Sequence, residues 1–250
     1  MSQLLESPGF RRGVGPFRTL IIAAALLLTA GVALRVSPSV AQGARAIPAP
    51  ALAEPATQQM TSEVAIVAGG CFWGVQGVFQ HVEGVTSAIS GYAGGTRDAA
   101  QYERVSTGTT GHAEAVRITV DPHRISYGRI LRIYFSVAHD PTEINRQGPD
   151  VGTQYRSAIF PANQGQARAA EAYIAQLNQA RVFPAGIATR IELSREFYPA
   201  EAYHQDYLTR NPTNRYIAVN DLPKIEDLKR LFPEVYRAAP VLVAASQPSN

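Results

Sequence analysis

The single cysteine of this 250-residue chain, Cys71, is the residue whose type and position most directly suggest chemistry. It follows Gly69-Gly70 and precedes a predicted helix that begins near Phe72. Amide N–H groups and the positive end of a helix dipole point at such a position, which lowers the pKa of a thiol and favours the thiolate. Free cysteines are more often small buried apolar residues. Because Cys71 follows a glycine pair instead of lying on the apolar face of the helix, we predict a reactive thiol.

The cysteine and histidine residues also limit the kinds of site that the chain can form. One cysteine excludes an internal disulfide and a multi-cysteine zinc site. The five histidines show neither His-x-His nor His-Glu-x-x-His spacing. We therefore predict no metal site and interpret His112, His139 and His204 as parts of the scaffold.

The elements that position Cys71 can be predicted from apolar periodicity. A short apolar run over 64–68 predicts a buried strand that ends at the glycine pair. The spacing of Phe72, Val75, Phe79 and Val82 predicts an amphipathic helix directly after it. Interspersed strands and helices of this kind indicate an α/β or α+β fold. Further strands are predicted at 116–120, 158–160 and 187–193, and further apolar helical faces after Ser126, over 167–177 and over 225–231.

Composition and charge restrict the class of protein. With 46% hydrophobic and 17% charged residues, the chain can bury one sizeable core, which excludes a wholly disordered, collagen-like or disulfide-stapled protein. The net charge of +3 comes entirely from residues 1–41, because residues 42–250 contain 19 basic and 19 acidic side chains. A nucleic-acid partner is therefore not expected.

The N-terminal segment is typical of an exported protein. Arg11, Arg12 and Arg18 precede an apolar stretch over 20–34, and Ser39-Val40-Ala41 supplies small residues for cleavage. We expect residues 1–41 to be a signal peptide, or alternatively an uncleaved membrane anchor, and the protein to be periplasmic or otherwise extracytoplasmic. The remaining chain divides into an Ala/Pro-rich tether (42–62), a catalytic domain (63–237) and a loose C-terminal tail (238–250).

Six ordered sequence blocks carry a resemblance to a known family. The first is Gly70-Cys71-Phe72-Trp73-Gly74, and the matching region extends from about 64 to 212. In these blocks the chain resembles the A-type peptide methionine sulfoxide reductases. The other five blocks are residues 91–95, 110–116, 139–142, 147–157 and 197–205.

The resemblance implies a fold, a reaction and a substrate. The fold would be a two-layer α/β sandwich with a mixed sheet and a ferredoxin-like core. The reaction would be the reduction of methionine S-sulfoxide, free or within oxidised proteins, without a bound cofactor or metal. We expect a monomer, with a membrane as partner only if the N-terminal segment stays uncleaved.

Four catalytic residues are implied by the resemblance. The Cys71 thiolate would attack the sulfoxide sulfur, and Glu114 would protonate the sulfoxide oxygen. For that step Glu114 must be protonated, so an apolar setting should raise its pKa. Tyr102 and Tyr155 would hold the oxygen through their phenol groups.

Three further residues would bind the substrate. Phe72 and Trp73 would receive its S-methyl group through sulfur–aromatic contacts. Asp150 would hold water or a substrate nitrogen at the rim of the site.

The reaction would leave Cys71 as a sulfenic acid, which many family members resolve with a second cysteine. This chain lacks that cysteine and so departs from the family pattern. Ser106 stands where one such cysteine often lies, and the segment 216–236 contains none. We therefore expect an external thiol to reduce Cys71, namely a thioredoxin-like protein, a glutaredoxin-like protein or a low-molecular-weight thiol.

Two other functions remain open at this level. A cysteine-dependent acyl transferase or hydrolase would need a histidine within hydrogen-bond reach of Cys71. A non-enzymatic thiol sensor would use Cys71 only for reversible oxidation and would form no methionine.

Overall fold

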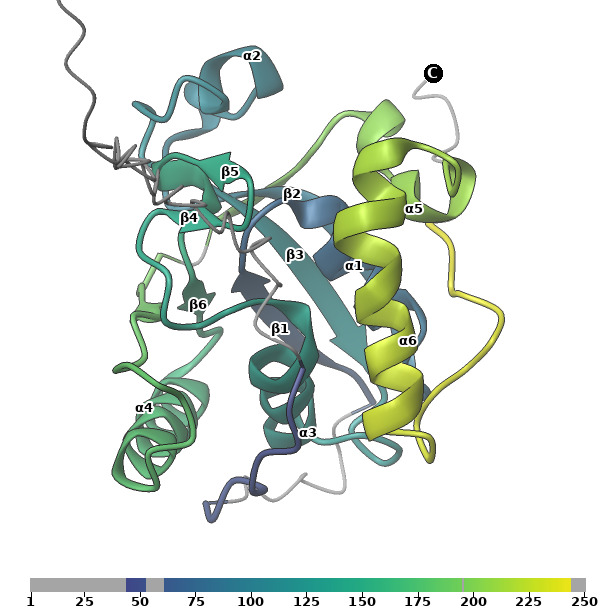
Figure 1. Cartoon of the computed structure of the whole chain (residues 1–250). Helices are drawn as coiled ribbons and strands as arrows, with labels where there is room; N and C mark the ends of the chain where they lie inside the picture. Colours follow the sequence, from purple (N-terminus) through teal and green to yellow (C-terminus); the bar gives the residue numbers. More distant parts are fainter. Residues whose placement is uncertain (1–43, 53–60, 195, 244–250) are drawn as a thin grey trace, which may run out of the picture. The chain divides into compact units, whose positions relative to one another are not determined.

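The computed structural model describes residues 44–52, 61–194 and 196–243 (Figure 1). The predicted signal segment lies outside these residues. Within the described part, no helix is both long and apolar enough to cross a bilayer.

A six-stranded mixed sheet forms the centre of the fold and confirms the predicted α/β class. Its strand order is β7-β6-β1-β3-β2-β8, and all neighbours pair antiparallel except β6 and β7. A separate two-stranded hairpin contains β4 and β5. The strand bounds are β1 (Glu63–Ala68), β2 (Val85–Ala93), β3 (Ala113–Val120), β4 (Arg146–Gln147), β5 (Asp150–Val151), β6 (Ala158–Phe160), β7 (Arg190–Ile191) and β8 (Phe197–Pro199).

Helices connect these strands and pack on the sheet. The helix α3 begins where Ser126 caps the amide of Arg129 at 3.2 Å, as the sequence predicts. It continues into a π-helical segment η2 (Tyr134–Ala138), and a second such segment, η5 (Ile217–Asp221), leads into α6. The α-helices are α1 (Phe72–Gln80), α2 (Tyr102–Val105), α3 (Tyr127–Ile133), α4 (Gln164–Gln179), α5 (Tyr207–Arg210) and α6 (Leu222–Leu231).

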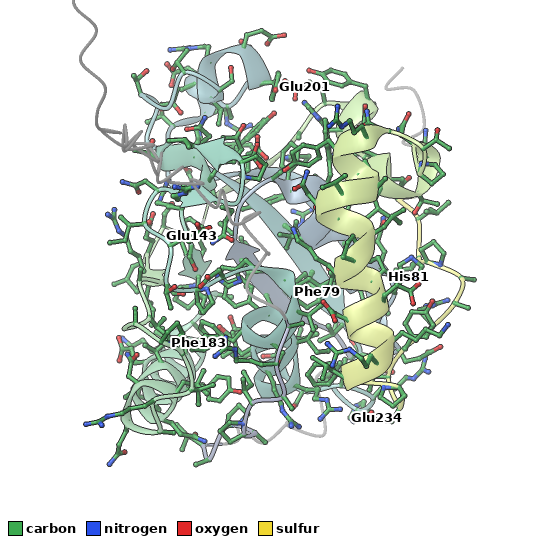
Figure 2. The ribbon with its side chains drawn as sticks, in the orientation of Figure 1. Phe79, His81, Glu143, Phe183, Glu201 and Glu234 are labelled. Atoms are coloured by element: carbon green, nitrogen blue, oxygen red, sulfur yellow. The ribbon has the colours of Figure 1, made fainter. Side chains whose placement is uncertain are left out.

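The alternation of side chains along the strands divides the interior into a large and a small apolar cluster. On β1, Ala65 and Val67 contribute to the large cluster with α1 and α3, whereas Ile66 and Ala68 face a smaller one. Phe79 of α1 lies in the large cluster, between α3 and α6 in the view of Figure 2. The apolar stripe of α1 therefore fixes the helix, and with it Cys71, against the sheet.

The region expected to be a tether is partly packed. Ile47 is only 2% exposed, and its carbonyl accepts a hydrogen bond from Arg132 of α3 at 2.8 Å. The carbonyl of Pro48 likewise accepts from Tyr173 of α4 at 2.6 Å. Residues 44–52 therefore differ from the expected tether, because these backbone groups and one apolar side chain bind to two helices. Residues 53–60 lie outside the described part.

The start of the predicted loose tail is also held in place. Backbone groups of Val241 and Val243 donate to Gln80 and Asp206, at 2.9 and 3.0 Å. Residues 244–250 lie outside the described part.

The predicted and observed strands differ, and the short strands β4, β5 and β8 were not predicted. The strand expected over 187–193 is reduced to Arg190–Ile191, which pairs parallel at the edge of the sheet. The nine-residue β2, between β3 and β8, has no counterpart in the apolar pattern, because its sequence VTSAISGYA is rich in small and polar residues.

Candidate active site

Cys71 lies at the N-terminus of α1, where the chain leaves the buried strand β1. Gly70 has φ +90°, and a Cβ atom on it would lie 2.6 Å from Gln147. A Cβ atom on Gly69 would lie 2.8 Å from the ring of His139. The glycine pair is therefore required by close packing and a left-handed backbone, and it places the half-buried Cys71 side chain beside the loop 139–150.

Glu114 of β3 lies beside the first turn of α1. Its side chain is buried, and its carboxylate accepts a hydrogen bond from the backbone N–H of Phe72 at 3.0 Å. Burial and the nearby Asp150 carboxylate raise the pKa of Glu114 to about 8, although the Phe72 amide opposes this shift. The raised pKa agrees with the prediction, and Glu114 is protonated at neutral pH.

The predicted lowering of the Cys71 pKa is wrong. Burial raises the pKa of the thiol well above its usual value, and the charges of Glu114, Asp221 and Asp150 raise it further. A hydrogen bond from the Trp73 amide lowers the pKa but does not balance these effects. The start of the helix does present an amide to the sulfur, but three carboxyl groups surround the same atom.

The ionisation of Cys71 is therefore coupled to that of Glu114. A proton on Glu114 removes a negative charge beside the sulfur, so protonation of the carboxyl group favours the thiolate. This combination, an acid and a thiolate, is the one that sulfoxide reduction requires.

The two predicted phenol groups come from different loops to the same cluster. Tyr102 begins α2, and Tyr155 ends the short helical turn η3 (Thr153–Tyr155). Burial raises the pKa of both phenols, and the charges of Glu114, Cys71 and Asp150 raise it further. Both tyrosines thus keep their protons and can donate hydrogen bonds.

Asp150 also reaches this cluster, from β5. Burial raises its pKa, while the hydroxyl of Tyr216 donates a hydrogen bond that lowers it. The structure therefore brings Asp150 together with Cys71, Glu114 and the phenols.

The aromatic pair after Cys71 points into two different environments. The ring of Phe72 is buried against Tyr92 and His204, at centroid distances of 5.9 and 5.0 Å. Trp73 stacks on Tyr207 at 3.8 Å and meets the edge of Tyr216 at 6.1 Å. Phe72 is thus enclosed by aromatic neighbours, whereas Trp73 is partly exposed.

His204 connects these aromatic residues, although the sequence interpretation treats it only as scaffold. Its Nδ1 accepts a hydrogen bond from the indole N–H of Trp73 at 3.2 Å, and its ring lies 4.7 Å from that of Tyr102. Burial lowers the pKa of His204, so the ring is neutral. It positions the aromatic groups of the site by packing.

Glu201 holds the backbone of Tyr102 in place. Its carboxylate accepts hydrogen bonds from the amide of Tyr102 at 3.0 Å and from the hydroxyl of Tyr92 at 2.9 Å. Figure 2 labels Glu201 beside α2. The matched sequence block contained Glu201 but gave no reason to select it.

Two residues of the C-terminal segment also reach the site and were not selected from the sequence. Tyr216 donates to Asp150, as described above, and Asp221 is fully buried beside the first turn of α1. A Cβ atom on Gly74 would lie 2.1 Å from the Asp221 carboxylate. Only the fold reveals these neighbours, because they lie about 150 residues from Cys71 in the chain.

The other two histidines selected as scaffold fit that role. His139 lies next to Gly69, and its two ring nitrogens bond to Ser157 at 2.7 Å and to the carbonyl of Tyr134 at 3.2 Å. Burial lowers the pKa of His139 to about 3. His112 bonds to Gly95 and Thr96. Within the described residues, no three acidic, histidine or cysteine side chains could hold a metal ion together.

Comparisons with known proteins point to one family. A family model described as peptide methionine sulfoxide reductase matches residues 63–235. A reductase of Mesorhizobium japonicum, named peptide methionine sulfoxide reductase MsrA 2, is 61% identical over 74% of this chain and 95% of its own. A protein of the same name from Synechocystis is 49% identical over 71% of this chain and 83% of its own.

Solved structures agree with this match. Methionine sulfoxide reductase A of Corynebacterium diphtheriae is 33% identical with a TM-score of 0.52, over 67% of this chain and 84% of that one. Reduced Mxr1 from Saccharomyces cerevisiae is 31% identical with a TM-score of 0.55, over 65% of this chain and 91% of that one.

Proposed function

Because the chain belongs to the peptide methionine sulfoxide reductase family and is a peptide-methionine (S)-S-oxide reductase of protein repair, we propose that Cys71 is its nucleophile and Glu114 its acid. The Cys71 thiolate attacks the sulfoxide sulfur while Glu114 donates a proton to the oxygen. The oxygen moves to Cys71, whose sulfur loses two electrons as the substrate sulfur gains two. Methionine leaves, and Cys71 remains as a sulfenic acid.

The observation that carries this assignment is the position and charge state of Glu114. Its carboxyl group contacts the amide of Phe72, next to the sulfur, and its pKa of about 8 keeps it protonated at neutral pH. A carboxylic acid in this position can donate a proton where negative charge develops on the sulfoxide oxygen.

The remaining site residues are proposed to bind the sulfoxide. Tyr102 and Tyr155 donate hydrogen bonds to its oxygen, which their raised pKa values support. Phe72 and Trp73 pack against its S-methyl group. Asp150 holds a water molecule or a nitrogen of the substrate at the rim.

An external thiol is proposed to complete the cycle, because Cys71 is the one cysteine of the chain. A thiolate attacks the sulfenic sulfur, an S–S bond forms, and the oxygen leaves as water. A second thiol then releases reduced Cys71 and a disulfide. The donor is a thioredoxin-like protein, a glutaredoxin-like protein or a low-molecular-weight thiol.

Mass spectrometry of the enzyme tests this assignment. After incubation with methionine S-sulfoxide and no thiol, the peptide containing Cys71 should react with dimedone in stoichiometric yield. Cys71→Ser should release no methionine, and Glu114→Gln should form the adduct far more slowly. An unmodified Cys71 in enzyme that has released methionine would contradict the proposal.

The competing hydrolase function finds less support in the geometry. His139 lies close to Cys71, but both of its ring nitrogens bond to Ser157 and Tyr134. It is therefore not free to take a proton from the thiol.

Two further expectations are retained as proposals. We propose a two-layer sandwich with a ferredoxin-like core, supported by the order β6-β1-β3-β2 with α1 and α3 as the connecting helices. We also propose export to a periplasmic or other extracytoplasmic compartment, on the basis of the basic and apolar pattern over 11–41.

A further inference from the structure

A cavity of about 320 Å³ lies beside Cys71, between the segment 136–150 and the segment 216–227. Cys71 and Asp150 line it, but Glu114, Tyr102 and Tyr155 are not among the described residues in its wall. The cavity therefore approaches the sulfur from a different side than the acid and the two phenols. Its volume is in the range of small-molecule sites.

The second half-reaction, in which an external thiol reduces the Cys71 sulfenic acid, requires that the thiol can reach the sulfur from such a side. Substitution at a divalent sulfur proceeds with the attacking thiolate opposite the leaving oxygen. In the proposed first half-reaction, Glu114 and the phenols hold that oxygen. The thiolate must then approach from the side away from these groups, which is where the cavity lies.

The wall of the cavity is acidic. Asp140 and Asp150 line it without an ion-pair partner among the described residues, whereas Glu143 and Asp227 pair with Arg146 and Arg230. Figure 2 labels Glu143 near the β4–β5 hairpin.

The single cationic side chain in the described wall does not offset this charge. The Lys224 ammonium lies 3.1 Å from the buried Asp221 carboxylate and is engaged by it. His139, also in the wall, is neutral because burial lowers its pKa to about 3. A thiol that carries a further negative charge is therefore disfavoured here.

We infer that this cavity admits a low-molecular-weight thiol of positive or zero charge to the Cys71 sulfenic acid, on the side away from Glu114. The inference rests on the proposed function and specifies its reductant. The thiolate forms an S–S bond with Cys71 as the S–O bond breaks, and the oxygen takes up protons and leaves as water. A second molecule of the same thiol then attacks the sulfur that the first molecule contributed to this mixed disulfide. Cys71 leaves as a thiolate, and the two thiol molecules are joined as a disulfide.

The test begins with enzyme that has completed one turnover without thiol, so that Cys71 is a sulfenic acid. Its reduction is then followed with cysteamine, 2-mercaptoethanol and 2-mercaptoethanesulfonate, with each rate expressed per thiolate. We expect the cationic thiol to react fastest and the anionic thiol slowest. The difference should shrink as salt is added.

Charge variants at Val219 examine the cavity itself. Val219 lines the cavity and is 64% exposed, so a charged side chain fits there without burial. Val219→Lys should accelerate the anionic thiol by about three- to tenfold, the size of a nearby charge interaction in a partly screened site, and Val219→Glu should slow it. The neighbouring Ala218 is exposed and does not line the cavity, so Ala218→Lys and Ala218→Glu are the matched controls.

The outcomes separate this inference from the proposed function. Equal per-thiolate rates for the three thiols, or equal effects at positions 218 and 219, would overturn the cavity assignment. Reduction by a dithiol protein but by none of the small thiols would overturn it as well. Failure of the proposed function would appear earlier, as the absence of methionine before any thiol is added.

Discussion

The carboxyl group of Glu114 lies 3.0 Å from the backbone nitrogen of Phe72, the residue that follows Cys71. This contact joins the central strand β3 to the first turn of α1. It fixes a buried acid beside the sulfur and makes the charges of the two groups interdependent. The site therefore combines a proton donor and a nucleophile through a backbone contact.

Removal of the acid should mainly affect the first half-reaction. Glu114→Gln keeps the size and the hydrogen-bonding capacity of the side chain but cannot donate an acidic proton. We expect the single-turnover rate of methionine formation to fall by about 10²- to 10⁴-fold. Glu103→Gln, at an exposed position of α2, is the control and should react like the wild type. A Glu114→Gln rate within twofold of the wild type would exclude Glu114 as the acid.

The same carboxyl group should determine how the rate varies with pH. The protonated form is required, and the pKa of Glu114 is about 8. Cys71 must be ionised in the same state, and the pKa of its thiol lies above that of Glu114. The single-turnover rate should therefore rise with pH up to about 8 and level off there, because further ionisation of the thiol is offset by loss of the Glu114 proton. In Glu114→Gln the rate should keep rising above pH 8. Rapid-quench measurements from pH 6 to 10 test this expectation. A break near pH 8 in both proteins would assign it to another group.

Burial of Glu114 should also make the fold less stable at alkaline pH. Its pKa is about 8 in the folded state but near 4.5 when unfolded, so the stabilisation present below pH 4.5 is lost as the pH rises through 8. Relative to Glu114→Gln, the wild type should lose up to about 5 kcal/mol of unfolding free energy between pH 4 and 9, at about 1.36 kcal/mol per pKa unit. Urea unfolding of both proteins at each pH isolates this contribution, and a difference independent of pH would contradict it.

Asp221, which packs against Gly74 of α1, should also control the acidity of Cys71. Its carboxylate raises the pKa of the thiol, and its Oδ2 has no hydrogen-bond partner among the described residues. Asp221→Asn should therefore lower the Cys71 pKa and speed alkylation by iodoacetamide at pH 7. Glu226→Gln, an exposed change in the following helix α6, should leave the alkylation profile unchanged. A higher Cys71 pKa in Asp221→Asn would refute this electrostatic role.

The packed segment before β1 should contribute to stability. Ile47 is 2% exposed within the large apolar cluster, so Ile47→Ala should reduce the unfolding free energy by about 2–4 kcal/mol. Leu52→Ala, at a side chain that is 51% exposed, should change it by less than about 0.5 kcal/mol. Equal effects of the two substitutions in urea unfolding would show that residues 44–52 do not pack as described.

The sequence predicts the elements around Cys71 well because their apolar residues repeat with a clear period. Phe72, Val75 and Phe79 all lie in the core on α1, as expected. The strand β2 shows no such pattern, because its core residues Val85, Ala88 and Tyr92 are unevenly spaced among small and polar residues. The packing of Ile47 could likewise not be predicted, since one isolated apolar side chain in an Ala/Pro-rich segment forms no periodic pattern.

The chemistry of the site was predicted less completely than its residues. The structure brings together Cys71, Glu114 and the two phenols, which the resemblance implied, and the raised pKa of Glu114 follows from burial. The pKa of Cys71 was predicted with the wrong sign, because helix position alone omits the carboxylates of Asp150 and Asp221. Such charges become visible only when distant parts of the chain are placed in space.

Single-turnover methionine release without a reductant is the most direct test of Cys71 as the nucleophile that reduces methionine S-sulfoxide. Wild type and Cys71→Ser are each mixed with the S or the R epimer of methionine sulfoxide, and methionine per enzyme is counted. Wild type should release about one equivalent with the S epimer alone, and Cys71→Ser should release none. Methionine from Cys71→Ser, or none from wild type whose Cys71 is confirmed by mass to be reduced, would contradict this role of Cys71.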